Sequence, residues 1–223
     1  MHRAKANVYV DGFNLYKRSL SGRAGVKWLD LLVLAQLALP EFDIQKVYYF
    51  TARLKPGATF DARAPQRQQV YLRALATRAF KIEIIYGNFR VDARNLVALP
   101  KVEHASGTAW LTTKVLKTEE KGTDVNLAGR LVADLLTSAC EIGVVVTNDS
   151  DQVGPIKMLT EEFECRVGLL FPFHEGTKAN RELRSTNVEF ARTITLEQLQ
   201  ASQFDQMLKD AHGEIHVPPE WVV

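Results

Sequence analysis

Residues 8–16 read VYVDGFNLY, an apolar run that stops at an acid, a glycine and a carboxamide. With the two residues before it, the run ANVYV (6–10) has the composition of a buried β-strand. Taken alone, Asp11 and Gly12 are equally typical of a plain turn after a strand. Whether Asp11 has a function therefore depends on whether acids elsewhere in the chain can reach it.

Strands and helices alternate along the rest of the chain. Further strands are predicted at 46–52, 81–87, 143–148 and 165–171, and helices at 28–39, 63–79, 123–140 and 152–163. Residues 88–120 are predicted to form a hairpin or an irregular excursion, and short helices at 178–184 and 195–201 flank a strand near 188–190. Continuous apolar strands separated by helices indicate a mostly parallel sheet that is covered on both faces. We therefore expect one three-layer α/β/α domain over residues 1–223, with a core at about 5–172 and a C-terminal extension at about 173–223.

The composition is that of a globular protein. Of 223 residues, 46% are hydrophobic, and the net charge of +2 neither demands nor excludes a nucleic-acid partner. Cys140 and Cys165 stand in no CxxC pair, which disfavours a zinc site and a disulfide framework. No run of 18 apolar residues and no signal-peptide pattern occurs. We expect no membrane span and a cytoplasmic location.

Two acids follow another predicted strand. Asp149 and Asp151 lie in TNDSDQ, directly after the strand at 143–148. Open parallel sheets bind their ligands beyond the carboxyl ends of the strands. If this strand neighbours the first one, both acids are expected to lie beside Asp11.

A fourth acid, Asp124, begins the predicted helix at 123–140. An acid in a first turn can simply interact with the helix dipole, and Thr123 is a candidate N-cap. A helix that leads into a strand is also expected to begin at the edge of the sheet opposite the site. Asp124 then reaches the other acids only if its helix crosses toward the site or if residues 88–120 deliver the helix start to that edge.

Carboxylates that converge resist joint ionisation, and a divalent cation offsets their repulsion. Ligands that are all oxygen suit Mg²⁺ or Mn²⁺. The predicted metal ligands and catalytic acids are Asp11, Asp124, Asp149 and Asp151, and Asn14 is a further catalytic and substrate-binding candidate because it could orient a bound water or a phosphate. The other predicted substrate-binding residues are Lys121, Thr147, Asn148 and Ser150.

Three segments together resemble the NYN domain family, a branch of the PIN-like nuclease fold, and look closest to its LabA-like bacterial subgroup. They are VYVDGFNLY (8–16), EEKGTDVNLAGRLVADLL (119–136) and VVVTNDSD (144–151). The resemblance implies a Rossmann-like (PIN-like) sandwich and a metal-dependent ribonuclease site built from the same four aspartates, with Asn14 beside them. It also implies that the start of the 123–140 helix reaches the site. Gln152, after the last aspartate, departs from the family pattern, which bears on substrate preference more than on metal binding.

The leading hypothesis is a metal-dependent endoribonuclease that hydrolyses single-stranded or structured RNA with Mg²⁺ or Mn²⁺. The alternative is a catalytically silent module of the same fold that binds RNA or a protein. A phosphatase with Asp11 as nucleophile ranks lower, because the best-known motif has a second aspartate where this chain has Phe13. A homo-oligomer or a protein partner is left open.

Overall fold

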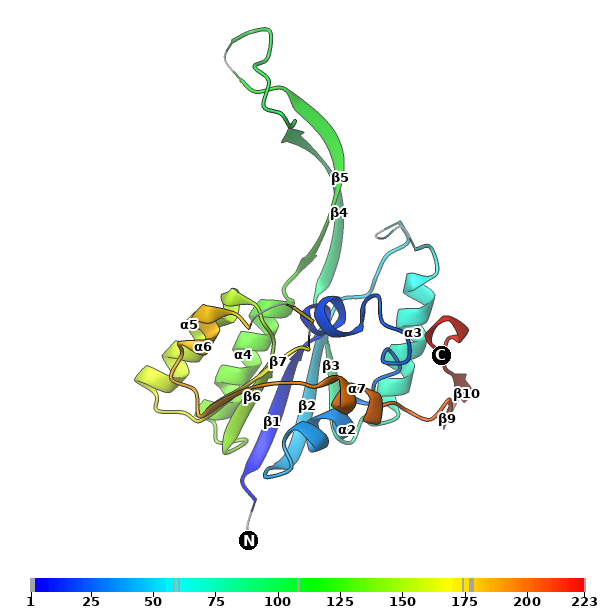
Figure 1. The fold of residues 1–223 in the computed structure, drawn as a ribbon, viewed down its shortest axis with the longest axis vertical. Coiled ribbons are helices and arrows are strands. Elements are labelled where there is room, and N and C mark those ends of the chain that lie inside the picture. The colour runs from blue at the N-terminus through cyan, green and yellow to red at the C-terminus, as the bar shows by residue number, and fades with distance from the viewer. Residues whose placement is uncertain are drawn as a thin grey trace.

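The computed structural model describes residues 3–57, 59, 61–107, 109–173, 175–176 and 179–222. A central sheet lies between two layers of helices, and a long hairpin projects from the body (Figure 1). This arrangement confirms the predicted three-layer α/β/α sandwich.

The central sheet has six strands, all parallel, in the order β3-β2-β1-β6-β7-β8. The strands are β1 (Lys5–Asp11), β2 (Asp43–Thr51), β3 (Ile82–Tyr86), β6 (Ile142–Val146), β7 (Val167–Phe171) and β8 (Phe190–Thr193). The predicted neighbourhood of the first strand and the strand at 143–148 is confirmed, because β1 pairs with β6. In that pairing Val10 lies opposite Val146, so Asp11 and Thr147 leave the sheet side by side.

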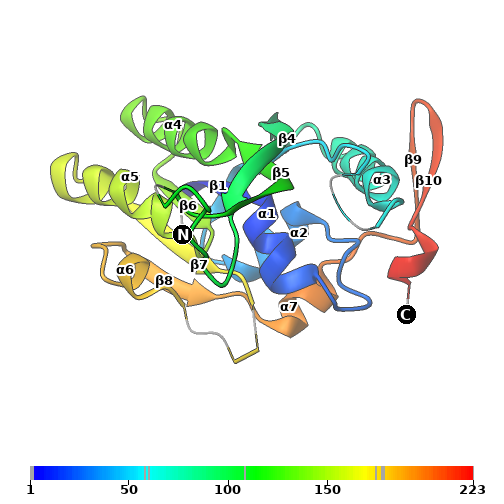
Figure 2. The same cartoon turned by 90° about the horizontal axis from the view of Figure 1, so that it is seen from above.

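Alternate residues of β1 face different helix layers, as expected for a strand that is buried on both sides. Val8 and Val10 belong to one core cluster and Tyr9 to the other. The first cluster includes residues of α2 (Leu31–Ala38), α3 (Ala64–Ala76) and α7 (Leu196–Ala201). The second includes residues of α4 (Thr123–Leu136), α5 (Val153–Lys157) and α6 (Arg181–Arg184). Figure 2 shows these two groups of helices on opposite sides of the sheet. Within the described residues, no helix combines the length and the apolar character that a membrane span needs.

Shorter elements complete the body. After β1 the chain forms α1 (Gly12–Leu15) and a π-turn (Tyr16–Leu20), and a second π-turn (Met158–Glu162) follows α5. The predicted helix at 28–39 begins only at Leu31, because the Asp30 side chain accepts hydrogen bonds from the backbone N–H groups of Leu32 and Val33. A C-terminal hairpin of β9 (Met207–Asp210) and β10 (Gly213–His216) was not predicted. Arg73 of α3 pairs with Asp210 at 2.5 Å and holds this hairpin to the body.

Residues 88–121 form the projecting hairpin, which we call the arm. It consists of β4 (Asn88–Val97) and β5 (Thr112–Lys121), paired antiparallel in a sheet of their own. Of the two alternatives for this region, the structure therefore shows the hairpin. The arm leaves the body after β3 and returns directly before α4, at the carboxyl edge of the central sheet (Figure 1).

Candidate metal centre

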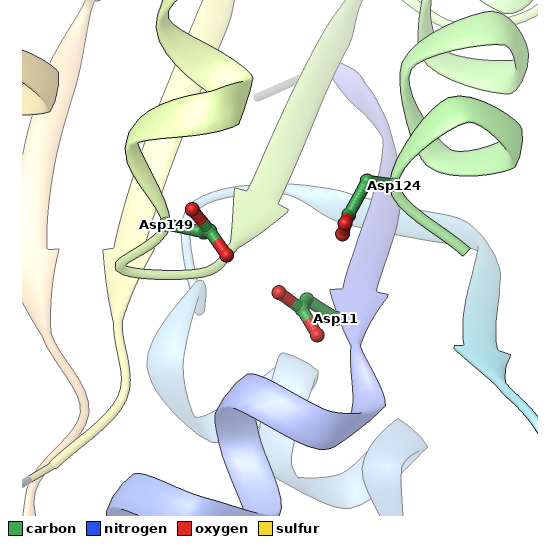
Figure 3. Close-up of side chains that lie close together, drawn as sticks. All are labelled: Asp11, Asp124 and Asp149. Carbon is green, nitrogen blue, oxygen red and sulfur yellow. The ribbon is translucent and has the colours of Figure 1, made fainter. Parts of the chain in front are cut away.

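Three aspartates from distant parts of the chain converge at the carboxyl edge of the sheet. One carboxylate oxygen from each of Asp11, Asp124 and Asp149 lies within 4.8 Å of the other two. Figure 3 shows the three side chains around a shared space. Asp11 ends β1, Asp124 lies in the first turn of α4, and Asp149 follows β6. We call these residues the acidic triad.

The Asp11 carboxylate is held by one hydrogen bond to each oxygen. Its Oδ1 accepts from the backbone N–H of Asn14 at 2.9 Å, and its Oδ2 accepts from the hydroxyl of Thr147 at 3.0 Å. The first bond makes Asp11 the N-cap of α1. Asp11 therefore serves the turn and the site at once, because capping fixes the orientation in which its carboxylate faces the other acids.

Gly12 explains the small residue after Asp11. A Cβ at this position would lie 2.6 Å from the backbone oxygen of Phe50 and 2.7 Å from the ring of Tyr49. Both distances are far below van der Waals contact, so only glycine lets α1 begin against β2. The Asp-Gly pair thus serves close packing as well as the turn.

Asp124 reaches the site without any unusual topology. The expectation that its helix begins at the opposite edge is wrong, because a crossover helix starts at the carboxyl edge and carries the chain back to the amino edge of the next strand. The arm departs from and returns to the carboxyl edge, so α4 starts there. The helix is capped by Gly122, at φ 93°, and not by Thr123. The Glu120 carboxylate accepts from the backbone N–H of Thr123 at 2.9 Å.

The segment after β6 is tied to the segment after β1. The Thr147 hydroxyl accepts from the backbone N–H of Asp149 at 3.1 Å, and the Asn14 side-chain oxygen accepts from the backbone N–H of Asn148 at 3.0 Å. The Asn148 side-chain oxygen in turn accepts from the backbone N–H of Asn180 at 2.7 Å. These oxygens of Asn14, Thr147 and Asn148, which were predicted to serve catalysis or substrate, hold the loops of the site together.

Three other predicted site residues lie outside the triad. Ser150 and Asp151 are exposed on a 3₁₀ turn (Ser150–Gln152), where the backbone N–H of Asp151 donates to the Asp149 carboxylate at 3.2 Å. The structure therefore does not bring Asp151 into the group of ligands that was predicted for it. Lys121 is exposed at the end of the arm and pairs with Glu119 at 3.2 Å.

The three carboxylates of the triad repel one another when they are ionised. The pKa of the Asp11 carboxyl is raised to about 6, and burial is the largest cause. The hydrogen bonds from Asn14 and Thr147 lower it, and the charges of Asp124 and Asp149 raise it. Burial also raises the pKa of Asp124, and the charges of Asp149, Glu120 and Asp151 add to the effect. A divalent cation among the three carboxylates would reverse these shifts, so the donor set fits such an ion.

A cavity of about 730 Å³ opens beside the triad, which forms part of its wall. Sequence reasoning did not find this space. Its lining combines aromatic rings with cations, including Phe13, Tyr49, Tyr71, Phe89, Lys17, Lys27 and Arg67. Lys17 and Lys27 carry no sequence signal, because single lysines at unrelated positions form no pattern.

No family model matches the chain. It is 27% identical to 6-hydroxy-3-succinoylpyridine 3-monooxygenase HspA of Pseudomonas putida over an alignment of 205 positions, and the match covers 84% of this chain. The chain spans 64% of the length of that curated relative. A crystal structure of a protein of unknown function from Vibrio parahaemolyticus superposes with a TM-score of 0.52 and 14% identity, covering 88% of this chain and 96% of the other. That likeness supports the fold alone.

These comparisons correct one expectation. The predicted enzyme class, an endoribonuclease that hydrolyses phosphodiester bonds, is contradicted by the curated relative, whose name is that of a monooxygenase. That name points to an oxidoreductase and away from a hydrolase.

Proposed function

We propose that the acidic triad binds a divalent cation, Mg²⁺ or Mn²⁺, and that the chain binds RNA through this ion. The observation that carries the proposal is the convergence of three carboxylates from β1, α4 and the loop after β6 within 4.8 Å. A buried carboxylate beside two others costs free energy unless a cation is present. The ion supplies positive charge to which a phosphate oxygen can bind.

The ligand atoms favour these two ions. The triad offers carboxylate oxygens only, which suit Mg²⁺ or Mn²⁺ better than the softer metals that prefer thiolate or imidazole. Asp11 is fixed by Asn14 and Thr147, so its carboxylate does not need to be ordered when the ion arrives. Preorganisation of this kind lowers the entropic cost of binding.

The adjoining cavity supports RNA as the ligand. Lys17 and Lys27 line it and make no ion pair within the described part of the chain, so their charges are available to phosphates. The rings of Phe13 and Phe89, with centroids 6.1 Å apart, lie in its wall and offer surfaces on which bases can stack. A cytoplasmic location belongs to the same proposal, and the two free cysteines, Cys140 and Cys165, fit a reducing compartment.

The first experiment is a calorimetric titration of the purified protein with Mn²⁺ and Mg²⁺, beside an Asp149→Asn variant. Fluorescence anisotropy then follows a labelled single-stranded RNA in each metal and in EDTA. We expect the variant to lose both the metal and the metal-dependent part of RNA binding. Asp151→Asn is the matched control, since Asp151 lies two residues away but outside the triad.

RNA affinity that is the same in EDTA and in metal contradicts the proposal. A DNA of the same sequence shows whether the ribose contributes. Strand cleavage forms no part of the proposal, and a gel of the same samples records whether the RNA stays intact during the titration.

A second candidate comes from the curated relative, which is named for the monooxygenation of a hydroxylated pyridine that carries a succinoyl group. The cavity of about 730 Å³ has the size of a small-molecule site, and aromatic rings and cations line it. A monooxygenase consumes dioxygen and a two-electron reductant, and it places one oxygen atom in the substrate and the other in water. Oxygen uptake with reduced nicotinamide and 6-hydroxy-3-succinoylpyridine tests this candidate, and no uptake above the protein-free rate eliminates it for this substrate.

A further inference from the structure

We infer that the arm is the contact through which two copies of this chain associate around a two-fold axis. Its strands, β4 and β5, pack chiefly on each other and not on the body. At the root, the Phe13–Phe89 ring contact and the hydrogen bond between Thr123 and Glu120 anchor it. A two-stranded hairpin without further packing is at best marginally stable in water. A structure of this length therefore needs a partner surface.

The strand register separates the arm into two unlike faces. Opposed residues of an antiparallel pair share a face, and successive residues alternate. One face carries the apolar side chains of Phe89, Val91, Ala93, Val97 and Leu116, and we call it the apolar face. Five polar side chains lie among them: Asn95, Thr112, Lys114, Thr118 and Glu120. The inner rows of the other face are charged: Arg90, Asp92, Arg94, Lys117 and Glu119.

The charged face is already satisfied by its own residues. Arg90 pairs with Asp92 at 2.8 Å, and Arg94 pairs with Glu119 at 3.4 Å. Lys117 also pairs with Glu119, whose pKa these lysine contacts lower to about 2. This ladder of alternating charge needs no partner and keeps the face solvated.

The apolar face remains uncovered. Leu116 is 65% exposed and Val97 is 44% exposed, and beyond them at the tip Leu99 is 86% exposed and Trp110 is 46% exposed. The row of Asn95 and Lys114 separates Leu116 from Val97, and Leu96 on the charged face is also 44% exposed. Exposed apolar side chains that gather along the arm and its tip in this way mark a site of protein association. They favour a protein partner over RNA, because binding of a phosphate backbone calls for unpaired cations and not for aliphatic side chains.

The charges on the apolar face point to a second copy of the same chain. Glu120 lies at the root of this face, and Lys114 lies further out. Lys114 makes no ion pair among the described residues. Two arms that run antiparallel about a two-fold axis between the Val91–Thr118 row and the Ala93–Leu116 row bring these two rows together and place Lys114 of each copy opposite the partner's Glu120. A surface that matches itself in this way is the requirement for an isologous dimer.

The arm faces alone bury less area than a stable dimer does. Ten residues per strand span about 34 Å, and two strands are about 10 Å wide, so two such faces bury together about 700 Å². A stable dimer buries about 1,200–2,000 Å² in total. In the antiparallel arrangement, contact between the tip of each arm and the partner's body supplies the remaining area.

This arrangement has a consequence for the acidic cavity. Phe89, Thr118 and Glu120, at the root of the apolar face, also line that cavity. The tip of the partner's arm would therefore lie at the mouth of the site. It would bring Trp110, which has the Lys101 ammonium 5.7 Å from its ring centroid, to the entrance.

The test is the mass of the full chain in solution, measured by sedimentation over a range of concentrations. We expect wild type to have about twice the mass of one copy, which is 25.1 kDa. Leu116→Glu should raise the dissociation constant about tenfold or more, because it buries a charge at the centre of the contact. Val115→Glu is the matched control, since Val115 lies on the opposite face across from Arg94 and should leave the mass unchanged.

A cross-link tests the axis itself. In a Cys165→Ser background, a flexible thiol-reactive cross-linker with a span of roughly 13 Å should join Ala93→Cys between copies, because facing sheets lie about 10 Å apart, which is too far for a direct disulfide. Val115→Cys should not be joined.

The inference is wrong if the wild-type protein has the mass of one copy at every concentration. It is also wrong if Leu116→Glu leaves the dimer intact. If the wild-type protein is a monomer and Leu116→Glu weakens RNA binding, the apolar face binds nucleic acid and the inference is wrong. Asp149→Asn should leave the dimer mass unchanged. The metal proposal can therefore fail without affecting the test of the dimer.

Discussion

The hydroxyl of Thr147 donates to the Asp11 carboxylate at 3.0 Å across the boundary between β1 and β6. The same hydroxyl accepts from the backbone N–H of Asp149 at 3.1 Å. One neutral side chain thus sets the separation of two members of the triad, although Thr147 and Asp11 are 136 positions apart in the chain.

Thr147→Val removes this link and keeps the shape of the side chain. Asp11 then loses a hydrogen bond that favours its charged form, so its pKa rises further. We expect Mn²⁺ affinity at neutral pH to fall by about tenfold, the worth of one hydrogen bond to a charged group. Calorimetry measures this change, and Thr147→Ser, which keeps the hydroxyl, should restore most of the affinity.

Metal affinity of the wild-type protein should depend on pH. Because the pKa of Asp11 is raised to about 6, the metal-free triad takes up a proton as the pH falls through that value. The proton competes with the ion, so affinity should decrease about tenfold per pH unit below about 6 and level off above it. A binding curve that is flat from about pH 5 to 8 would show that Asp11 is not a ligand.

Asp11→Asn should stabilise the metal-free fold. A carboxyl whose pKa is raised on folding binds its proton more tightly in the folded state, so its contribution to stability is lost as the pH rises from about 4 to about 6. At neutral pH the neutral amide avoids this cost, which is on the order of 2–3 kcal/mol, and the loss of good geometry with Thr147 offsets part of the gain. Urea unfolding in EDTA measures the free energy of unfolding. With Mn²⁺ present the order should reverse, because only wild type gains stability from the ion.

The fold followed from the sequence because its strands are continuous apolar runs, and such runs have few alternatives to a covered parallel sheet. The periodicity of apolar residues predicted the buried face of α4 less well. The apolar pattern of its sequence puts Val125 and Leu136 on the buried face together with Leu127, Leu131 and Leu135. The structure buries the latter three, whereas Val125 is 75% exposed and Leu136 is 47% exposed. Helix periodicity defines a face only to within a residue or two, and the sheet that α4 packs on determines its edge.

The candidate site followed from the sequence only in part. The sequence predicts where the strands end and therefore which acids follow them. Asp11 and Asp149 could be placed beside each other from the expected topology alone. The side chain of Asp151 could not be placed, since two residues along a 3₁₀ turn decide whether it meets the triad or solvent. The cavity was beyond prediction as well, because its wall draws on β2, α3 and the arm, whose relative positions no local pattern encodes.

Gly12→Ala should damage the site through the backbone. The added methyl group meets the Phe50 carbonyl oxygen at 2.6 Å, and backbone atoms cannot move aside as a flexible side chain does. We expect a loss of about 1–3 kcal/mol in the free energy of unfolding and weaker Mn²⁺ binding, since α1 must shift and carries the capping bond of Asp11 with it. Gly129→Ala is the control, because a Cβ there meets nothing within 4 Å and alanine suits the interior of α4. A Gly12→Ala protein with wild-type stability and metal affinity would contradict the packing argument.

Asp134 shows how an acid of the same helix differs from a member of the triad. It is buried on α4, where it accepts hydrogen bonds from the Tyr9 hydroxyl at 2.8 Å and the Asn7 amide at 3.0 Å and pairs with Arg130 at 3.0 Å. Its charge is therefore already neutralised within the protein, whereas Asp11 has only neutral donors. Asp134→Ala should cost about 3–5 kcal/mol of unfolding free energy, because it leaves these partners buried without an acceptor. The folded fraction of this variant should bind Mn²⁺ as wild type does, and loss of the ion from well-folded Asp134→Asn protein would mean that the network also supports the metal centre.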